Sequence, residues 1–262
     1  MFVEINGARI HYERSGSGFP VILLHAGVAD SRMWGRQVDA FARHFEVITA
    51  DERGYGDSDL PPEPWSPVKD LLALMDHLDL KPAHLVGCSM GGALAIDFAL
   101  DHPGRMSKLV LVGAGLGGYP HREEDRHLYA AVVEADAKND LVALNEAEAQ
   151  LWLDGPTRPR GYIKQSLRDL FLDMNGRSLK SDFDSAPREE LLPPAAERLN
   201  EISAPTLVVV GDKDLPPILE IADVLRDSIA GARKVVINDA AHLPSLEHPD
   251  EFNRLVLDFL KS

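Results

Sequence analysis

The sequence predicts a three-layered α/β fold in which helices cover both faces of a mostly parallel central sheet. Six short apolar runs are each followed by loop or helical sequence, and they cover residues 21–25, 46–50, 83–87, 108–112, 206–210 and 234–237. Continuous apolar strands that alternate with helices are typical of a parallel sheet buried on both faces. With 262 residues, of which 45% are hydrophobic, the chain is long enough to form one large core.

Two further strands are expected ahead of these runs. The stretches "MFVEING" and "ARIHYERSG" alternate apolar and polar residues around Asn6 and Gly7, a pair that favours a tight hairpin turn. Helical periodicity is present in five stretches, at residues 34–44, 68–78, 90–101, 218–229 and 252–260. We expect these helices to connect the strands and to cover the sheet.

Between residues 115 and 204 the alternation of strands and helices stops. This segment has no convincing apolar strand, is rich in charge and proline, and contains helix-like stretches such as "RHLYAAVVEADAKN" and "LVALNEAEAQLWL". We therefore expect a helical lid at residues 117–200, inserted after the sixth strand. It would separate two parts of the core, at residues 1–116 and 201–262.

Composition excludes several classes of protein. A net charge of -15, with no run of Lys or Arg, disfavours binding to nucleic acid and to anionic membranes. No apolar run approaches the roughly 20 residues of a spanning helix, and the first residues lack the pattern of a secretory signal, so we expect a cytoplasmic protein. Cys88 is the single cysteine, and the histidines lack paired ligand spacing, so we expect neither a disulfide nor a metal site. The oligomeric state stays open.

One motif points to chemistry. "GCSMG" places Ser89 between Gly87 and Gly91, where an apolar strand gives way to a helix. This is the pattern and the context of a nucleophile elbow, a tight turn that lifts a serine clear of the sheet. The amide of Met90, at the first turn of the helix, would point to where an oxyanion forms. The competing interpretation is a glycine-rich turn that serves packing or binds phosphate.

A serine hydroxyl needs a base to activate it, and the base needs a group to orient it. Downstream, "TLVVVGDKD" ends a predicted strand with Asp212 and Asp214, and "VVINDAAHLPSLEHP" places His242 in a loop after the last strand. From the residues alone, Asp212 and Asp214 both remain candidates for the orienting acid. Asp239 lies nearer to His242 in sequence, but its place at a strand end favours a turn.

The motifs "LLHAG", "DERGYGDSD", "GCSMGG", "GDKD" and "AAHLPSLEHP" occur in this order along essentially the whole chain. In these motifs the sequence resembles α/β-hydrolases of the esterase, enol-lactonase and haloperoxidase-like group. The resemblance implies an α/β-hydrolase fold, with Ser89 as nucleophile, His242 as base and Asp214 as orienting acid. It also implies an oxyanion hole formed by the backbone amides of Gly27 and Met90, with Val28 as the donor if the loop register shifts by one.

The expected function is a serine hydrolase that cleaves small or medium carboxylic esters or lactones through an acyl-enzyme, without a cofactor. We expect its partner to be a small ester or lactone, contacted by Val28, Trp34, Trp152 and Leu243. A second candidate function is that of a carbon–carbon bond hydrolase of ring-cleavage products. In those relatives a tryptophan typically follows the catalytic histidine, where this chain has Leu243. A perhydrolase or acyltransferase, and a small-ligand receptor on the same fold, are further candidate functions.

Overall fold

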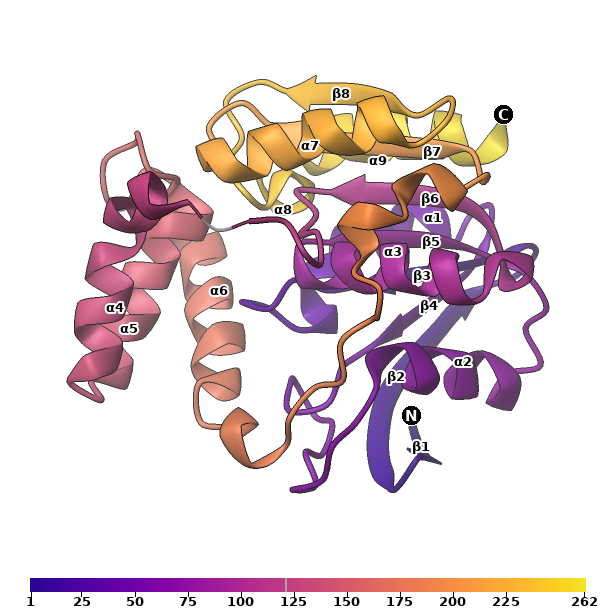
Figure 1. The fold of residues 1–262 in the computed structure, drawn as a ribbon, viewed down its shortest axis with the longest axis horizontal. Coiled ribbons are helices and arrows are strands. Elements are labelled where there is room, and N and C mark those ends of the chain that lie inside the picture. The colour runs from indigo at the N-terminus through magenta and orange to yellow at the C-terminus, as the bar shows by residue number, and fades with distance from the viewer. Residues whose placement is uncertain (121) are drawn as a thin grey trace.

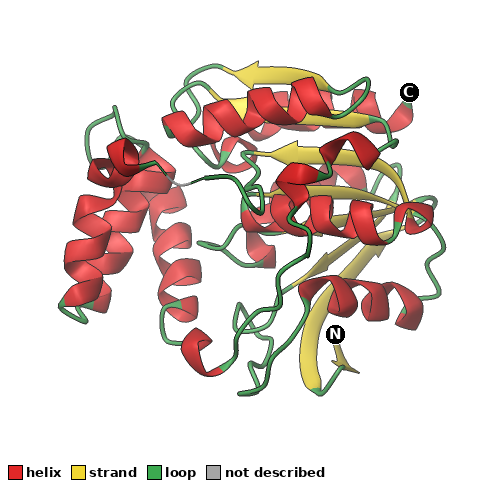
Figure 2. Ribbon diagram, viewed as in Figure 1, coloured by secondary structure: helices red, strands yellow, loops and turns green. Residues whose placement is uncertain are grey.

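The computed structural model describes residues 1–120 and 122–262, which fold around one sheet of eight strands (Figures 1 and 2). The strand order is β1-β2-β4-β3-β5-β6-β7-β8. The strands are β1 (Phe2–Ile5), β2 (Ala8–Gly16), β3 (Pro20–Leu24), β4 (Glu46–Ala50), β5 (Ala83–Cys88), β6 (Met106–Val112), β7 (Thr206–Gly211) and β8 (Arg233–Ile237).

The pairing of the strands confirms a mostly parallel sheet. β3 to β8 all pair in parallel, whereas β2 pairs antiparallel with both β1 and β4. The first two strands form the expected hairpin, and its turn residues Asn6 and Gly7 have positive φ values of 47° and 84°. Both central residues of a type I′ turn need such values, which Asn and Gly adopt readily.

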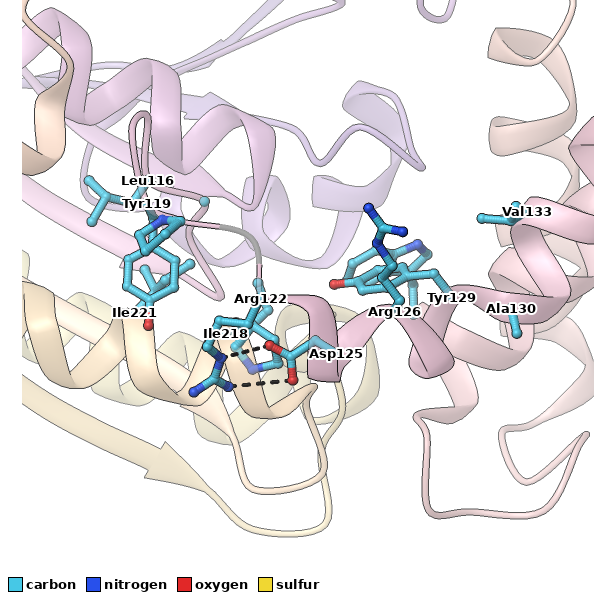
Figure 3. A pocket seen from close by; sticks show the side chains of 14 residues that line it. Leu116, Tyr119, Arg122, Asp125, Arg126, Tyr129, Ala130, Val133, Ile218 and Ile221 are labelled. Atoms are coloured by element: carbon cyan, nitrogen blue, oxygen red, sulfur yellow. Dashed lines mark hydrogen bonds and ion pairs between the residues drawn. The ribbon is translucent and has the colours of Figure 1, made fainter.

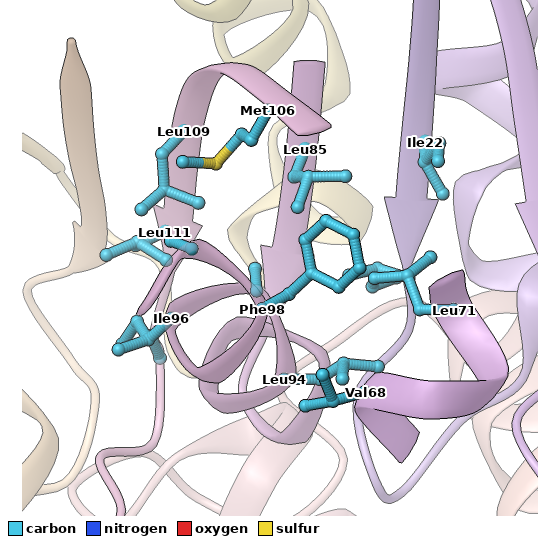
Figure 4. Close-up of a cluster of buried hydrophobic side chains, with 14 of the residues drawn as sticks. Ile22, Val68, Leu71, Leu85, Leu94, Ile96, Phe98, Met106, Leu109 and Leu111 are labelled. Carbon is cyan, nitrogen blue, oxygen red and sulfur yellow. The ribbon is translucent and has the colours of Figure 1, made fainter. Parts of the chain in front are cut away.

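Helices cover both faces of the sheet, as expected for a three-layered fold. α2 (Pro67–His77), α3 (Met90–Asp101) and α7 (Pro216–Ser228) pack on one face, where their apolar side chains form one core cluster (Figures 1 and 4). α1 (Gly35–Phe41) and α9 (Pro249–Lys261) cover the other face and contribute to a second cluster. On β3, Ile22 and Leu24 point into the first cluster while Val21 and Leu23 point into the second.

The chain between β6 and β7 is helical. It contains a 3₁₀ helix (Glu123–Tyr129), α4 (Ala130–Ala137), α5 (Leu141–Glu148), a π-helix (Ala149–Asp154), α6 (Gln165–Ser178) and three shorter 3₁₀ turns. α4, α5 and α6 lie together at one side of the core (Figure 1). The division of the chain at residues 116 and 201 and the role of residues 117–200 as a lid stay predictions. Residue 121 of that range lies outside the described residues.

The topology places the loops that follow the parallel strands at one edge of the sheet. The loops after β3, β5, β7 and β8 carry Gly27, Ser89, Asp214 and His242. In open α/β sheets, ligands bind at this edge, outside the carboxyl ends of the strands. Among the described helices, none is both long and apolar enough to cross a membrane.

Asp97 on α3 provides a test of the core next to this edge. Burial raises its pKa to about 6, and its Oδ1 atom is buried with no hydrogen-bond partner among the described residues. Because the folded state holds this proton more tightly than the unfolded state, Asp97 lowers stability as the pH rises from about 4 through 6.

We therefore expect Asp97→Asn to increase the free energy of unfolding at pH 8 by about 1–3 kcal/mol, with the increase disappearing near pH 4. Urea denaturation at the two pH values measures this difference. Asp258→Asn, which changes an exposed carboxylate on α9, is the matched control. An equal gain at both pH values would contradict the assignment.

Candidate active site

Ser89 occupies a strained turn between β5 and α3. Its backbone has φ 52° and ψ -111°, a conformation that residues other than glycine rarely adopt. Three hydrogen bonds hold it: the Ser89 amide donates to the Val112 carbonyl at 2.9 Å, and the amides of Ala93 and Gly115 each donate to the Ser89 carbonyl at 3.0 Å. Ser89 is half-buried, so this turn has the geometry that the motif predicts for a nucleophile elbow.

The two glycines of the motif allow backbone segments to approach closely at this turn. A Cβ atom on Gly87 would lie 2.2 Å from the carbonyl oxygen of Gly91, and one on Gly91 would lie 2.5 Å from that of Leu24. Real Cβ atoms do not approach so closely, so both positions require glycine. The turn is therefore fixed by contact with β3 as well as by its own sequence.

The loop after β3 brings Gly27 next to Met90. A Cβ atom on Gly27 would lie 3.5 Å from Met90 Sδ and 3.6 Å from Tyr55 Oη. His25 fixes the start of this loop, because its Nε2 accepts a hydrogen bond from the Glu52 amide at 2.9 Å and its Nδ1 lies 2.9 Å from the Ala26 carbonyl. The two expected oxyanion donors are thus neighbours, and half-buried Val28 follows them in the loop.

His242 and Asp214 form a buried pair. His242 Nδ1 lies 2.9 Å from Asp214 Oδ2 and 3.1 Å from Oδ1, and the Leu215 amide donates to Oδ1 at 2.7 Å. Both side chains are 1% exposed. His242 Nε2 is buried with no hydrogen-bond partner among the described residues. A carboxylate in this position holds the imidazole orientation and stabilises the imidazolium that forms.

The two other candidate acids make different contacts. Asp212 accepts a hydrogen bond from Lys213 Nζ at 2.8 Å, and Asp239 accepts one from Tyr162 Oη at 2.8 Å. Among the described carboxylates, Asp214 is the one bonded to the His242 ring. The geometry therefore favours Asp214 for the acid, and it leaves Asp212 and Asp239 as loop contacts.

Cys88, directly before Ser89, is a packing residue that also contacts the His242 loop. Its side chain is fully buried and its Sγ lies 3.9 Å from the His242 carbonyl oxygen. Burial, and secondarily the charge of Asp214, raise the pKa of this thiol far above its ordinary value. The thiol therefore stays protonated and is a poor nucleophile.

A cavity of about 740 Å³ is lined by residues of the loop after β6, of the segment between β6 and β7, and of α7, and its lining residues do not include Ser89, Asp214 or His242 (Figure 3). Gly115, whose amide bonds to the Ser89 carbonyl, and Trp152 both line it. The Trp152 ring lies 4.5 Å from the His242 ring and 6.2 Å from the Tyr129 ring, measured between centroids. The cavity is large enough for a small-molecule ligand, and Trp152 connects it to the candidate base.

The structure places two other expected substrate-binding residues in the core. Trp34 is fully buried, with its ring 6.2 Å from that of Phe252 on α9, and Leu243 is fully buried next to His242. Both belong to the second core cluster, and neither lines the cavity described above. Their packing explains the positions, and contact with substrate stays a prediction for both.

Residues 154–158 contact the loops that carry Asp214 and His242. Three residues that the sequence analysis did not single out make these contacts: Gly155, Arg158 and Glu247. Arg158 donates to the Glu247 carboxylate at 2.7 Å and to the Asp239 carbonyl at 3.1 Å. Glu247 in turn accepts a hydrogen bond from the amide of Ala241, the residue before His242, at 2.8 Å. Both charged side chains are almost fully buried, at 6% and 1% exposure.

Gly155 completes this connection. A Cβ atom on Gly155 would lie 2.9 Å from the Lys213 carbonyl oxygen and 3.0 Å from the Ala241 Cβ. The segment between β6 and β7 therefore contacts the residue before Asp214 and the residue before His242. No sequence signal marked Arg158, because it lies in a charged, proline-rich stretch that resembles an ordinary loop.

A sequence model of the alpha/beta hydrolase fold matches residues 20–249. The chain is 32% identical to a 2-hydroxy-6-oxo-6-phenylhexa-2,4-dienoate hydrolase of Comamonas testosteroni, and the match covers 98% of this chain and 93% of that relative. Among solved structures, an enol-lactonase from Burkholderia xenovorans superimposes with a TM-score of 0.81 at 28% identity, covering both chains fully. An esterase from Exiguobacterium antarcticum superimposes with a TM-score of 0.83 at 26% identity, covering 100% of this chain and 99% of that one.

Replacing each candidate acid separately tests the pairing of His242. We expect Asp214→Asn to lower kcat by about 10³- to 10⁴-fold, because the amide no longer stabilises the imidazolium. Asp212→Asn should change kcat by less than about 10-fold, since its carboxylate contacts Lys213. Steady-state kinetics of the two purified variants decide between them, and the reverse ranking would move the role to Asp212.

Arg158 should position His242 through Glu247. We expect Arg158→Met to lower kcat by about 10- to 100-fold with little change in KM, because the loop before His242 loses its anchor. Arg158→Lys should recover part of this loss by keeping the charge beside Glu247. The matched control is Arg160→Met, which removes an exposed arginine that pairs with Glu146 at 2.9 Å. An Arg158→Met protein that is folded and fully active would contradict this role.

Proposed function

The chain belongs to the alpha/beta hydrolase fold family and is a hydrolase, and from this premise we propose that it cleaves carboxylic esters or lactones through an acyl-enzyme at Ser89. The observation that carries the proposal is the buried His242–Asp214 pair, in which His242 Nε2 has no hydrogen-bond partner among the described residues. Together with the elbow at Ser89, it supplies the base and the nucleophile that acyl transfer requires.

In the proposed reaction, His242 Nε2 takes the proton of the Ser89 hydroxyl while Ser89 Oγ attacks the carbonyl carbon of the substrate. The backbone amides of Gly27 and Met90 donate hydrogen bonds to the oxyanion that develops. His242 then gives its proton to the leaving oxygen, and the acyl-enzyme remains. Water, deprotonated by His242, attacks the acyl carbon, and the acid is released as Ser89 regains its proton.

Carbon–carbon bond hydrolysis is the second candidate, and the names of the sequence relatives favour it. The Comamonas relative is named for a 6-oxo-6-phenyl dienoate, a molecule without an ester bond, so hydrolysis beside its ketone breaks a carbon–carbon bond. The enol-lactonase and esterase neighbours support the first candidate. Leu243, which follows His242 where the ring-cleavage hydrolases typically carry tryptophan, also favours the first.

The proposal predicts a higher kcat/KM for an ester than for a 6-oxo dienoate of the kind that ring-cleavage hydrolases act on. We expect a higher kcat/KM for 4-nitrophenyl butyrate than for 2-hydroxy-6-oxo-6-phenylhexa-2,4-dienoate, both followed by absorbance with the same purified protein. Ser89→Ala should lower kcat by about 10⁴-fold or more, because nucleophile and base act as one unit. Faster turnover of the dienoate would establish the second candidate, and tight binding without turnover of either compound would indicate a receptor.

A further inference from the structure

The hydroxyl group of Tyr55 lies beside both expected oxyanion donors. Tyr55 belongs to the loop after β4, the strand that pairs with β3. The position that a Cβ atom would take on Gly27 lies 3.6 Å from Tyr55 Oη, 3.5 Å from Met90 Sδ and 3.6 Å from Met90 Cβ. Since this position is two bonds from the Gly27 nitrogen, Tyr55 Oη lies within about 6 Å of that nitrogen. The hydroxyl is therefore close to the two amides that would bind an oxyanion.

Two aromatic contacts fix the Tyr55 ring. Its centroid lies 5.0 Å from that of the His25 ring and 5.2 Å from that of the Phe183 ring. His25 is itself held by the Glu52 amide and the Ala26 carbonyl. The Tyr55 ring thus packs between a loop of the core and the segment between β6 and β7. A donor that is held in place before the reaction needs no reorganisation when charge develops.

The Tyr55 hydroxyl is available to donate a hydrogen bond to a ligand. It makes no hydrogen bond to the described residues, whereas the hydroxyl of Tyr119 donates to Glu220 at 3.1 Å. A tyrosine hydroxyl that is withdrawn from water usually has a partner. Burial, and secondarily the charge of Glu52, raise the pKa of Tyr55. The phenol therefore keeps its proton at neutral pH.

The chemistry of the proposed reaction has a use for such a donor. When a serine attacks a carbonyl carbon, negative charge develops on the carbonyl oxygen, and donors aimed at this oxygen lower the barrier. The oxyanion has three lone pairs, so it can accept one hydrogen bond beyond the two from backbone amides. A hydroxyl hydrogen rotates about the C–O bond and can follow the oxygen as it moves.

We propose that Tyr55 is a further catalytic residue, whose hydroxyl donates a third hydrogen bond to the oxyanion that forms when Ser89 attacks the substrate. The proton stays on the phenol oxygen throughout, and no bond of Tyr55 is broken. The inference rests on the proposed function, in which Ser89 attacks a carbonyl carbon. Because attack on an ester and attack on a ketone both place charge on the carbonyl oxygen, the role of Tyr55 is the same for either candidate reaction.

The first test removes the hydroxyl and keeps the ring. We expect Tyr55→Phe to lower kcat for 4-nitrophenyl butyrate by about 10- to 100-fold and to change KM by less than about 3-fold, because the bond forms in the transition state. Phenylalanine retains both ring contacts, so thermal melting should match the wild type. Tyr12→Phe is the matched control, since Tyr12 is a buried tyrosine of β2 whose ring lies 6.0 Å from that of His77. A folded Tyr55→Phe protein with unchanged kcat would overturn the inference.

A second pair of substrates distinguishes the carbonyl oxygen from the rest of the acyl group. The loss of kcat in Tyr55→Phe should agree within about 3-fold between 4-nitrophenyl butyrate and 4-nitrophenyl methoxyacetate, because both esters present the same carbonyl oxygen. The methoxyacetyl group carries an ether oxygen that a hydroxyl could also bind. A loss seen for methoxyacetate alone would place Tyr55 against the acyl chain and would contradict its role at the oxyanion.

Binding of butylboronic acid separates failure of this inference from failure of the proposed function. Ser89 Oγ adds to boron, its proton passes to His242, and the tetrahedral boronate carries the negative charge, so no turnover is needed. By calorimetry, Ser89→Ala should abolish binding and Tyr55→Phe should weaken it by at least about 10-fold, with Tyr12→Phe unchanged. Equal affinity of the wild type and Tyr55→Phe would overturn the inference and leave the nucleophile assigned. A wild type without Ser89-dependent binding would overturn the proposed function, and this inference with it.

Discussion

The backbone at Ser89 is held in a left-handed conformation by hydrogen bonds to Val112, Ala93 and Gly115, and the other parts of the site depend on this turn. The first bond joins it to the end of β6, and the close contact of Gly91 with the Leu24 carbonyl joins it to the end of β3. A strained residue persists only where its surroundings determine its conformation. Here the neighbouring strands do so, and they also position the loops that carry Gly27 and Gly115 on either side of Ser89.

Asp214 and His242 are held in place by contacts with residues between β6 and β7. Gly155 packs against the residues before Asp214 and before His242, while Arg158 reaches the His242 loop through Glu247. Residues 154–158 therefore support the loops that carry Asp214 and His242. A movement of residues 154–158 would displace both loops. The buried Arg158–Glu247 pair is stabilising only while both partners remain, because removing one leaves an uncompensated buried charge.

Much of the fold could be predicted because its signals are local. Continuous apolar runs identified the parallel strands, the bounds of α3 were predicted at residues 90–101, and the motif around Ser89 led to the family. The substrate class was harder, since the curated relatives favour carbon–carbon hydrolysis over the ester cleavage expected first. Arg158 and Gly155 could not be found, because their importance arises from contacts with residues more than 50 positions away. The ring of Trp34 packs against Phe252, and the predicted contact of Trp34 with substrate stays a prediction.

The net charge of the protein bears on the choice between ester cleavage and carbon–carbon bond cleavage. A protein with a net charge of -15 repels anions in general, so it can bind an anionic substrate only where a local cluster of cations reverses the field. The dienoate named for the Comamonas relative carries its carboxylate on the fragment that departs when the bond beside the ketone breaks. Arg122 and Arg126 line the 740 Å³ cavity, and among the described residues Arg122 pairs with three carboxylates and Arg126 with one. The carboxylates around these two arginines therefore weaken the attraction of this cavity for a carboxylate of a substrate, and this favours a neutral ester or lactone over the dienoate.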